Sequence, residues 1–131
     1  MIRQFPMHIR STQFLAIVLV IACIARTAHA AEKRYGTDDA INHVGEYATV
    51  CGFVVTAEFA NFLENQPTFL NLAKRYPNEV FTAVIWGADR GRFDYPPESL
   101  RGSSICVTGE ITLNRGIAQI IVSTPDQIER K

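Results

Sequence analysis

The hydrophobic positions of this chain fall into one unbroken apolar run near the start and several shorter, β-rich runs after it. The first run, Phe14–Ala25, is apolar throughout. Beyond residue 45, segments rich in β-branched and aromatic residues alternate with segments rich in Gly, Pro, Asn and Asp. Such alternation is typical of strands separated by turns. The pattern therefore predicts an N-terminal leader followed by an all-β domain.

Five segments have the composition and periodicity of β-strands. They are Glu46–Ala60, Thr68–Ala73, Val80–Trp86, Ser103–Leu113 and Ile117–Ser123. The first is long and apolar on both faces, and Gly52 in its middle predicts a bulge or a sharp bend. In the second strand, Leu70 and Leu72 share one face. Phe69 and Asn71 then lie on the opposite face.

The segments between these strands predict turns and short helices. Thr37–Gly45 has the capping and acidic residues of a short helical turn, and Lys74–Glu79 is a turn that contains Pro77. Gly87–Gly102 lacks strand alternation and predicts a loop, with a helical turn over Pro97–Leu100 that has proline near its start. Asn114–Gly116 is a tight hairpin turn. The polar ends, Ala31–Gly36 and Thr124–Lys131, have no strand pattern.

This order of elements is typical of the OB-fold, a five-stranded, partly open Greek-key barrel. The OB-fold needs a long, bent first strand, an irregular or helical segment between the third and fourth strands, and a closing hairpin. We therefore expect a polar segment and short helix over residues 31–42 and the barrel over 43–128. An all-β sandwich is the alternative, although five strands are few for that architecture.

The first thirty residues are typical of a signal peptide. Arg3 and Arg10 precede the apolar run, which is shorter than a membrane span. Ala28 and Ala30 form the small-x-small pattern of a cleavage site, so we expect cleavage after Ala30. An uncleaved anchor and a lipoprotein attached at Cys23 are the alternatives. We therefore expect a periplasmic or secreted protein with no integral membrane span in its mature chain.

Removal of the leader changes the charge balance. The chain has 13 Lys and Arg and 13 Asp and Glu. Arg3, Arg10 and Arg26 lie in the leader and no acidic residue does. The remaining chain is therefore net acidic, which does not favour avid binding to nucleic acid.

Two cysteines follow the leader, Cys51 and Cys106. In an oxidising compartment an even number of cysteines favours a disulfide, and two buried free thiols are the alternative. In the expected OB-fold, Cys51 lies on the first strand and Cys106 on the fourth. These strands are antiparallel neighbours in that fold, and this further favours a disulfide between the two cysteines.

Three segments carry a resemblance to a known family. They are VCGFVV at 50–55, PTFLNLAKRYPNEVFTAVIWG at 67–87 and ICVTGEITLNRGIAQIIV at 105–122. Together they resemble small exported bacterial OB-fold domains of the nucleic-acid-binding type, which are similar to domains found beside thermonuclease-type domains. The resemblance spans roughly His43 to Ile128. It implies an OB-fold that binds single-stranded DNA or RNA, or a nucleotide, weakly and without catalysis.

The expected binding face lies over the second and third strands, between the flanking loops. It needs exposed aromatic rings for base stacking and cations for phosphates. Our candidate residues for nucleic-acid binding are Phe69, Asn71, Lys74, Arg75, Trp86, Arg90, Arg92 and Arg115. The alternative is that Phe69 and Trp86 pack in the core and that the loop cations are ordinary solvated charges.

Other chemistry has little support in the sequence. After the leader the chain has a single histidine, His43, and no C-x-x-C pair, so we expect no metal site and no cofactor. We assign His43 a capping or packing role. No catalytic motif is recognisable, and we expect no enzyme. The alternative function is a cell-envelope protein-interaction or scaffold domain, which the acidic balance would suit.

Overall fold

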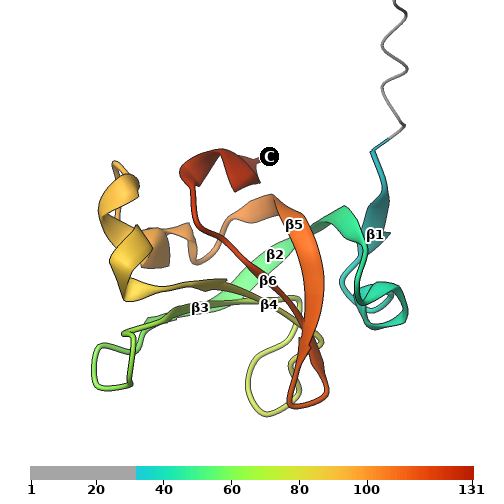
Figure 1. The fold of residues 1–131 in the computed structure, drawn as a ribbon, viewed down its shortest axis with the longest axis horizontal. Coiled ribbons are helices and arrows are strands. Elements are labelled where there is room, and N and C mark those ends of the chain that lie inside the picture. The colour runs from blue at the N-terminus through green and yellow to red at the C-terminus, as the bar shows by residue number, and fades with distance from the viewer. Residues whose placement is uncertain (1–31) are drawn as a thin grey trace, which may run out of the picture.

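The computed structural model describes residues 32–131, and these form seven strands and four short 3-10 helices (Figure 1). The strands are β1 (Arg34–Gly36), β2 (Tyr47–Phe59), β3 (Thr68–Leu72), β4 (Phe81–Ile85), β5 (Ser104–Asn114), β6 (Ile117–Ile121) and β7 (Ile128–Arg130). The helices are η1 (Ala40–His43), η2 (Gly87–Arg92), η3 (Pro97–Leu100) and η4 (Pro125–Gln127).

Five strands close into a barrel. Their order around the ring is β2, β3, β4, β6 and β5, and pairing of β5 with β2 completes it. The β4–β6 pair is parallel and the other pairs of the ring are antiparallel. This strand order confirms the predicted all-β, five-stranded OB-fold barrel with a short N-terminal helical turn and a helical segment between the third and fourth barrel strands.

The long strand β2 belongs to both halves of the barrel. Its first half pairs with β5 and its second half pairs with β3. The register shifts between Val54 and Thr56, so the bulge predicted at Gly52 lies farther along the strand. Gly52 has a different use. A Cβ atom there would lie 2.7 Å from Cγ2 of Thr37 and 3.3 Å from Cβ of Leu72, so the glycine allows close packing.

The barrel interior is filled by alternate residues of its strands. Leu70, Leu72, Phe81, Ile111 and Ile120 are completely buried, as period-2 alternation requires of the inward face. Helix η3 packs against β2 and β3, with its last residue Leu100 fully buried. The predicted helical turn at this place is therefore present and closes one end of the core.

Two short edge strands lie outside the predicted set. Strand β1 pairs with β2 in parallel, and β7 pairs with β5 in antiparallel fashion. The prediction that both ends lack strands is therefore wrong. Each edge strand has only three residues, and most of them are polar and exposed. Strands this short show no hydrophobic alternation, although Tyr35 of β1 and Ile128 of β7 pack against the core.

A disulfide joins the neighbouring strands β2 and β5. Cys51 and Cys106 are direct partners in the β2–β5 register, with an S–S distance of 2.05 Å. Nη1 of Arg34 lies 3.9 Å from each sulfur atom, so strand β1 partly covers the bridge. The predicted pairing is present, and disulfides are typical of oxidising compartments. The predicted signal peptide and Cys23 lie outside the described residues.

The N-terminal segment is attached to the barrel through Glu46. One carboxylate oxygen accepts hydrogen bonds from Nζ of Lys33 at 3.0 Å and from the Tyr35 hydroxyl at 2.9 Å. The other oxygen contacts Nδ1 of His43, whose ring stacks on Tyr35 with 3.5 Å between centroids. These donors, Lys33 first, lower the pKa of Glu46 to about 2. The packing role expected for His43 agrees with this arrangement.

Loss of the Glu46 charge should weaken the fold at low pH. The Glu46 carboxyl has a lower pKa in the folded chain than in the unfolded chain. Its stabilising contribution is therefore complete above pH 4.5 and is lost as pH falls toward 2. We expect Glu46→Gln to be less stable than the wild type at pH 6 and to differ little from it at pH 2. Urea denaturation of both proteins at these two pH values measures the difference, and an equal gap at both would contradict the role of the charge.

Candidate functional site

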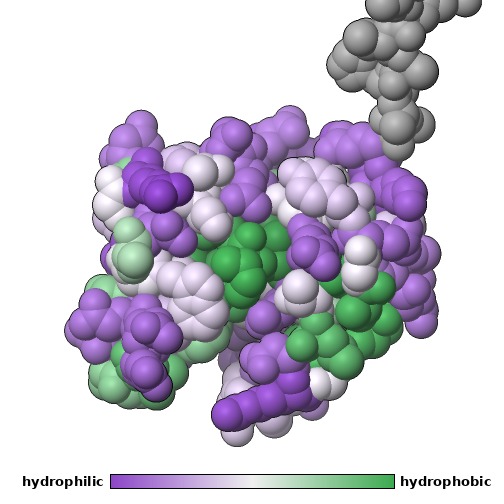
Figure 2. Space-filling view, in the orientation of Figure 1, coloured by the Kyte–Doolittle hydropathy of each residue, from purple (hydrophilic) through white to green (hydrophobic). Residues whose placement is uncertain are grey.

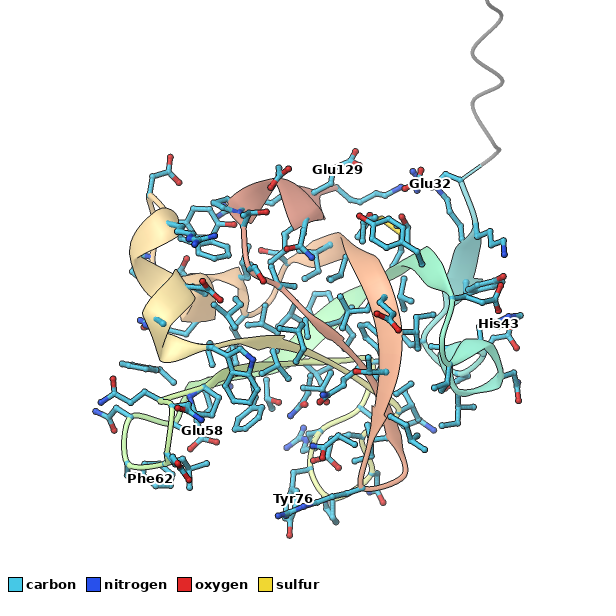
Figure 3. All side chains as sticks on the ribbon, viewed as in Figure 1. Glu32, His43, Glu58, Phe62, Tyr76 and Glu129 are labelled. Carbon is cyan, nitrogen blue, oxygen red and sulfur yellow. A yellow bond between two sulfur atoms is a disulfide. The ribbon has the colours of Figure 1, made fainter. Side chains whose placement is uncertain are left out.

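A groove crosses the outer face of the barrel over β3, β4 and β6. It consists of two adjoining hollows of about 460 and 340 Å³, which share Phe69, Asn114, Arg115 and Gln119. We call the two together the sheet groove. In Figure 2 the lower edge of the molecule is notched between two projecting loops. Figure 3 places Phe62 at the tip of one loop and Tyr76 at the tip of the other.

The floor of the sheet groove is made by the outward residues of three neighbouring strands. Phe69 on β3 pairs with Val84 on β4. Two residues farther along β3, Asn71 pairs with Thr82 on β4, and Thr82 pairs with Gln119 on β6. Direct partners share a face of the sheet, so an apolar row lies beside a polar row. The groove thus offers a hydrophobic ring next to amide and hydroxyl groups.

The amide of Asn71 is held in one orientation. Its Nδ2 donates to Oγ1 of Thr56 at 3.0 Å, and its Oδ1 accepts from Oγ1 of Thr82 at 2.8 Å. An asparagine amide has two N–H donors and two carbonyl lone pairs, so one of each remains for a ligand. Gln119 borders both hollows, and its side chain forms no hydrogen bond to residues 32–131.

Loops form the walls of the groove and add two aromatic side chains. Tyr76, in the β3–β4 loop, is 78% exposed, and Trp86, at the end of β4, is 37% exposed. The β5–β6 turn supplies Asn114 and Arg115 on the far side. Trp86 also borders a neighbouring hollow of about 550 Å³ beside Asp89, whose lining has no cation among residues 32–131. Rings therefore stand near the ends of the groove as well as on its floor.

The charges that line the groove are mixed. Arg115 is the cation there, and Glu58 and Glu79 are carboxylates. Within residues 32–131 neither carboxylate forms an ion pair. The groove therefore lacks the strongly positive lining of an avid nucleic-acid site.

The structure brings half of the predicted binding residues together. Phe69, Asn71, Trp86 and Arg115 line the sheet groove, and the alternation predicted for Phe69 and Asn71 is present. Phe69 is half-buried, so it is not a core residue. The other four candidates do not line it. Lys74 and Arg75 are exposed in the same loop as Tyr76 and can reach a ligand that extends beyond the groove.

Arg90, predicted as a phosphate contact, is bonded to other barrel residues and does not line the sheet groove. Its Nη1 and Nη2 donate to the two oxygens of Glu98 at 2.8 and 3.1 Å, and Nη1 also donates to Thr68 Oγ1 at 2.6 Å. Its guanidinium lies 3.6 Å from the Phe59 ring centroid. The hydrogen bonds from Arg90 lower the pKa of Glu98. Helix η2, unrecognised in the sequence, holds Arg90 against the barrel.

Arg92 lies on the same 3-10 helix and also outside the sheet groove. Its Nε is 3.6 Å from Oδ1 of Asp89, and its side chain is 58% exposed. A pair this exposed contributes little to stability. The cations predicted after the third strand therefore do not line the groove, because Arg90 bonds to Glu98 of η3 and Arg92 pairs with Asp89 within η2.

Replacement of Arg90 should affect stability and replacement of Arg115 should not. We expect Arg90→Ala to lower the free energy of unfolding by about 2 kcal/mol, because Glu98 loses charged hydrogen bonds. Arg115 is exposed in a turn, so Arg115→Ala should leave stability unchanged within about 0.5 kcal/mol. Chemical denaturation of the two variants checks this contrast. Equal stability of the two would contradict the structural role of Arg90.

Sequence reasoning missed several groove residues. Tyr76 belongs to the predicted turn, and its place beside two basic residues could have identified it. Glu58 and Gln119 lie on correctly predicted strands, Glu58 as an exposed residue between two half-buried ones and Gln119 between two buried ones. Their approach to Phe69 depends on the register between strands that are distant in sequence. No local pattern reports that register.

Other kinds of site have no support in the described part of the chain. Residues 32–131 contain no group of three or more His, Cys, Asp or Glu side chains placed to hold a metal ion. No helix in this range is long and apolar enough to cross a membrane.

Comparisons with known proteins show likeness in structure alone. No family model matches the chain, and no curated protein matches its sequence. A solved structure of the OBody AM1L10 bound to hen egg-white lysozyme is 15% identical, with a TM-score of 0.49 over 76% of this chain and 94% of that one. A putative aspartyl-tRNA synthetase from Leishmania major Friedlin is 12% identical, with a TM-score of 0.47 over 80% of this chain and 22% of the synthetase chain. The OB-fold assignment rests on the strand order described above.

Proposed function

We propose that this protein is an exported OB-fold binding module that holds single-stranded nucleic acid weakly in the sheet groove, without catalysis. It is proposed as a periplasmic or secreted member of the small bacterial OB-fold domains that the sequence resembles. The observation that carries the proposal is the partly exposed Phe69 ring on the groove floor, beside the fixed amide of Asn71.

Base stacking supplies most of the affinity in this account. An aromatic ring exposed on the face of a sheet accepts any base, and each stacked base contributes about 1–3 kcal/mol. Phe69 offers one such ring on the floor, and Trp86 offers another at the edge of the same groove. The amides of Asn71 and Gln119 lie beside these rings, where they can hydrogen-bond the edge of a stacked base.

Phosphate contacts are few. Arg115 lines the groove, and Lys74 and Arg75 stand on the neighbouring loop. Each phosphate neutralised on a single strand contributes about −0.7 to the slope of log K against log salt. One to three contacts therefore predict a slope of about −0.7 to −2. Binding should lie in the micromolar range because Glu58 and Glu79 repel the backbone.

Fluorescence anisotropy tests this proposal. Residues 31–131 are titrated into a labelled thymidine hexamer, as DNA and as RNA, at 20 and 150 mM salt. We expect micromolar binding at the lower salt and the shallow salt dependence given above. Replacing Lys74, Arg75 and Arg115 together with alanine should remove most of the salt dependence.

The matched control is Arg92→Ala, which removes an exposed cation outside the groove. This variant should bind as the wild type does. The proposal is wrong if no hexamer binds at 20 mM salt with the protein at 1 mM, or if Arg92→Ala weakens binding as much as the triple variant.

A cell-envelope protein partner is the second candidate function. The two unpaired carboxylates in the groove favour it, because they would attract a basic protein segment. Exposed apolar side chains on the η1 side also favour it: Ile41 and Val44 are each 42% exposed, and Leu113 is 54% exposed. Under this function the triple variant would keep its cellular role although it had lost oligonucleotide binding.

A further inference from the structure

We propose that Glu58 makes the sheet groove selective for guanine stacked on Phe69. This inference rests on the proposed function and names the base that the groove prefers. It assigns a role to a carboxylate that otherwise opposes nucleic-acid binding.

Glu58 and Phe69 are direct partners in the antiparallel β2–β3 pair. Side chains of direct partners lie on the same face of the sheet, with Cβ atoms about 5 Å apart. Both line the same hollow, and Figure 3 shows Glu58 on the side of the barrel that carries the β2–β3 loop. A base lying flat on Phe69 therefore presents its edge to the Glu58 carboxylate.

Glu58 has no internal partner to occupy it. Among residues 32–131 its carboxylate makes neither a hydrogen bond nor an ion pair, whereas Glu46 and Glu98 are held by several donors. An ionised carboxylate accepts hydrogen bonds and cannot donate. Glu58 thus offers two acceptor oxygens, without a donor, at the edge of a stacking platform.

This acceptor pair matches one base. The Watson–Crick edge of guanine carries two adjacent donors, N1–H and the 2-amino group. Adenine and cytosine each place a ring-nitrogen acceptor beside their amino donor, and thymine places carbonyl oxygens on both sides of its N3–H. Each of the other three bases therefore turns a lone pair toward the carboxylate, which repels it.

The charges across the groove set the orientation of the nucleotide. Glu58 lies at the β2 side, and Arg115 lies in the β5–β6 turn on the opposite side, with β3 and β4 between them. The phosphates are repelled by Glu58 and attracted by Arg115. This polarity directs the base toward β2 and the backbone toward the β5–β6 turn, so the Watson–Crick edge faces Glu58.

Anisotropy with single-base substitutions tests the proposal. A thymidine hexamer is compared with hexamers that carry guanine, adenine, cytosine or inosine at the third position. A good bidentate contact discriminates by about 1–3 kcal/mol, so guanine should bind at least fivefold tighter than adenine or cytosine. Inosine keeps N1–H and lacks the 2-amino group, so its affinity should fall between those of guanine and adenine.

Glu58→Gln removes the acceptor pair, because an amide presents one acceptor and one donor group. We expect the guanine preference of this variant to fall below twofold, while binding of the thymidine hexamer stays equal or improves. Glu79→Gln is the matched control, since it removes the other groove carboxylate, and it should keep the fivefold preference. Circular dichroism of both variants confirms that they fold.

The possible outcomes distinguish failure of the guanine selectivity from failure of the proposed function. If all hexamers bind with equal affinity, or if Glu58→Gln keeps the guanine preference, the role of Glu58 is wrong and the proposed function stands. If no hexamer binds, the proposed function fails and the guanine selectivity fails with it. If Glu79→Gln loses the preference as fully as Glu58→Gln, selectivity comes from general charge and the specific pairing with Glu58 is wrong.

Discussion

Replacing Cys51 and Cys106 together with alanine should lower the free energy of unfolding by about 4 kcal/mol. The bridge closes a loop with a sequence separation of 55 residues, and the chain-entropy model assigns this value to a loop of that length. Urea denaturation of the oxidised wild type and the double variant measures the difference. Alanine suits the test because Cys106 is only 2% exposed, where a serine hydroxyl would need a hydrogen-bond partner.

The double variant should still fold, because the β2–β5 pair keeps its backbone register on both sides of the bridge. Reducing agent provides the control: it should destabilise the wild type by a similar amount and leave the double variant unchanged. A loss below about 1 kcal/mol would show that the bridge contributes little to this fold. In that case the disulfide would have a role other than stabilising the fold.

Phe69→Ala should weaken binding of the thymidine hexamer about tenfold. One stacked base is worth about 1–3 kcal/mol by alanine substitution, and tenfold corresponds to about 1.4 kcal/mol. Phe69 is half-buried on the outer face, so its loss leaves the inward core residues Leu70 and Leu72 in place. Fluorescence anisotropy at 20 mM salt measures the change, and Phe69→Trp should restore or improve binding because it keeps a ring.

Phe53→Ala is the matched control for Phe69→Ala. Phe53 is 49% exposed on β2 and pairs with Ser104 on β5, away from the sheet groove. Its replacement removes the same side chain from another part of the barrel and should change hexamer affinity less than twofold. If the two alanine variants bind equally well, the Phe69 ring is not the stacking platform.

The barrel could be predicted from sequence because its strands are locally marked. The alternation of Leu70 and Leu72 with Phe69 and Asn71 specifies which face is buried. The tight turn before β6 and the length of β2 specify the order of pairing. The edge strands β1 and β7 could not be found in this way, because a strand of three residues is too short to show a periodic pattern.

Residues of the candidate site could be predicted only where the alternation of a single strand determines which way a side chain points. Phe69 and Asn71 follow from the alternation of β3 alone. The role of Arg90 depends on helix η2, which turns its guanidinium toward Glu98 and Phe59. The approach of Glu58 to Phe69 follows from the β2–β3 register beyond the bulge, and that register is a property of the closed barrel.

The sheet groove explains how an acidic domain could still bind nucleic acid. Its affinity would come from rings, and its few cations would place the backbone on one side. Carboxylates that oppose phosphates then become selective for the edge of a base. We therefore expect a weak, base-selective binder, which differs from the avid, basic type of single-strand binder.

Binding of nucleic acid in the sheet groove is tested by a heteronuclear NMR titration of ¹⁵N-labelled residues 31–131 with the guanine-containing hexamer. The account predicts that the largest shift changes fall on the side-chain amides of Asn71 and Gln119, the indole N–H of Trp86 and the backbone of Phe69. Changes confined to the η1 side, around Ile41 and Val44, or no change at millimolar hexamer, would contradict it.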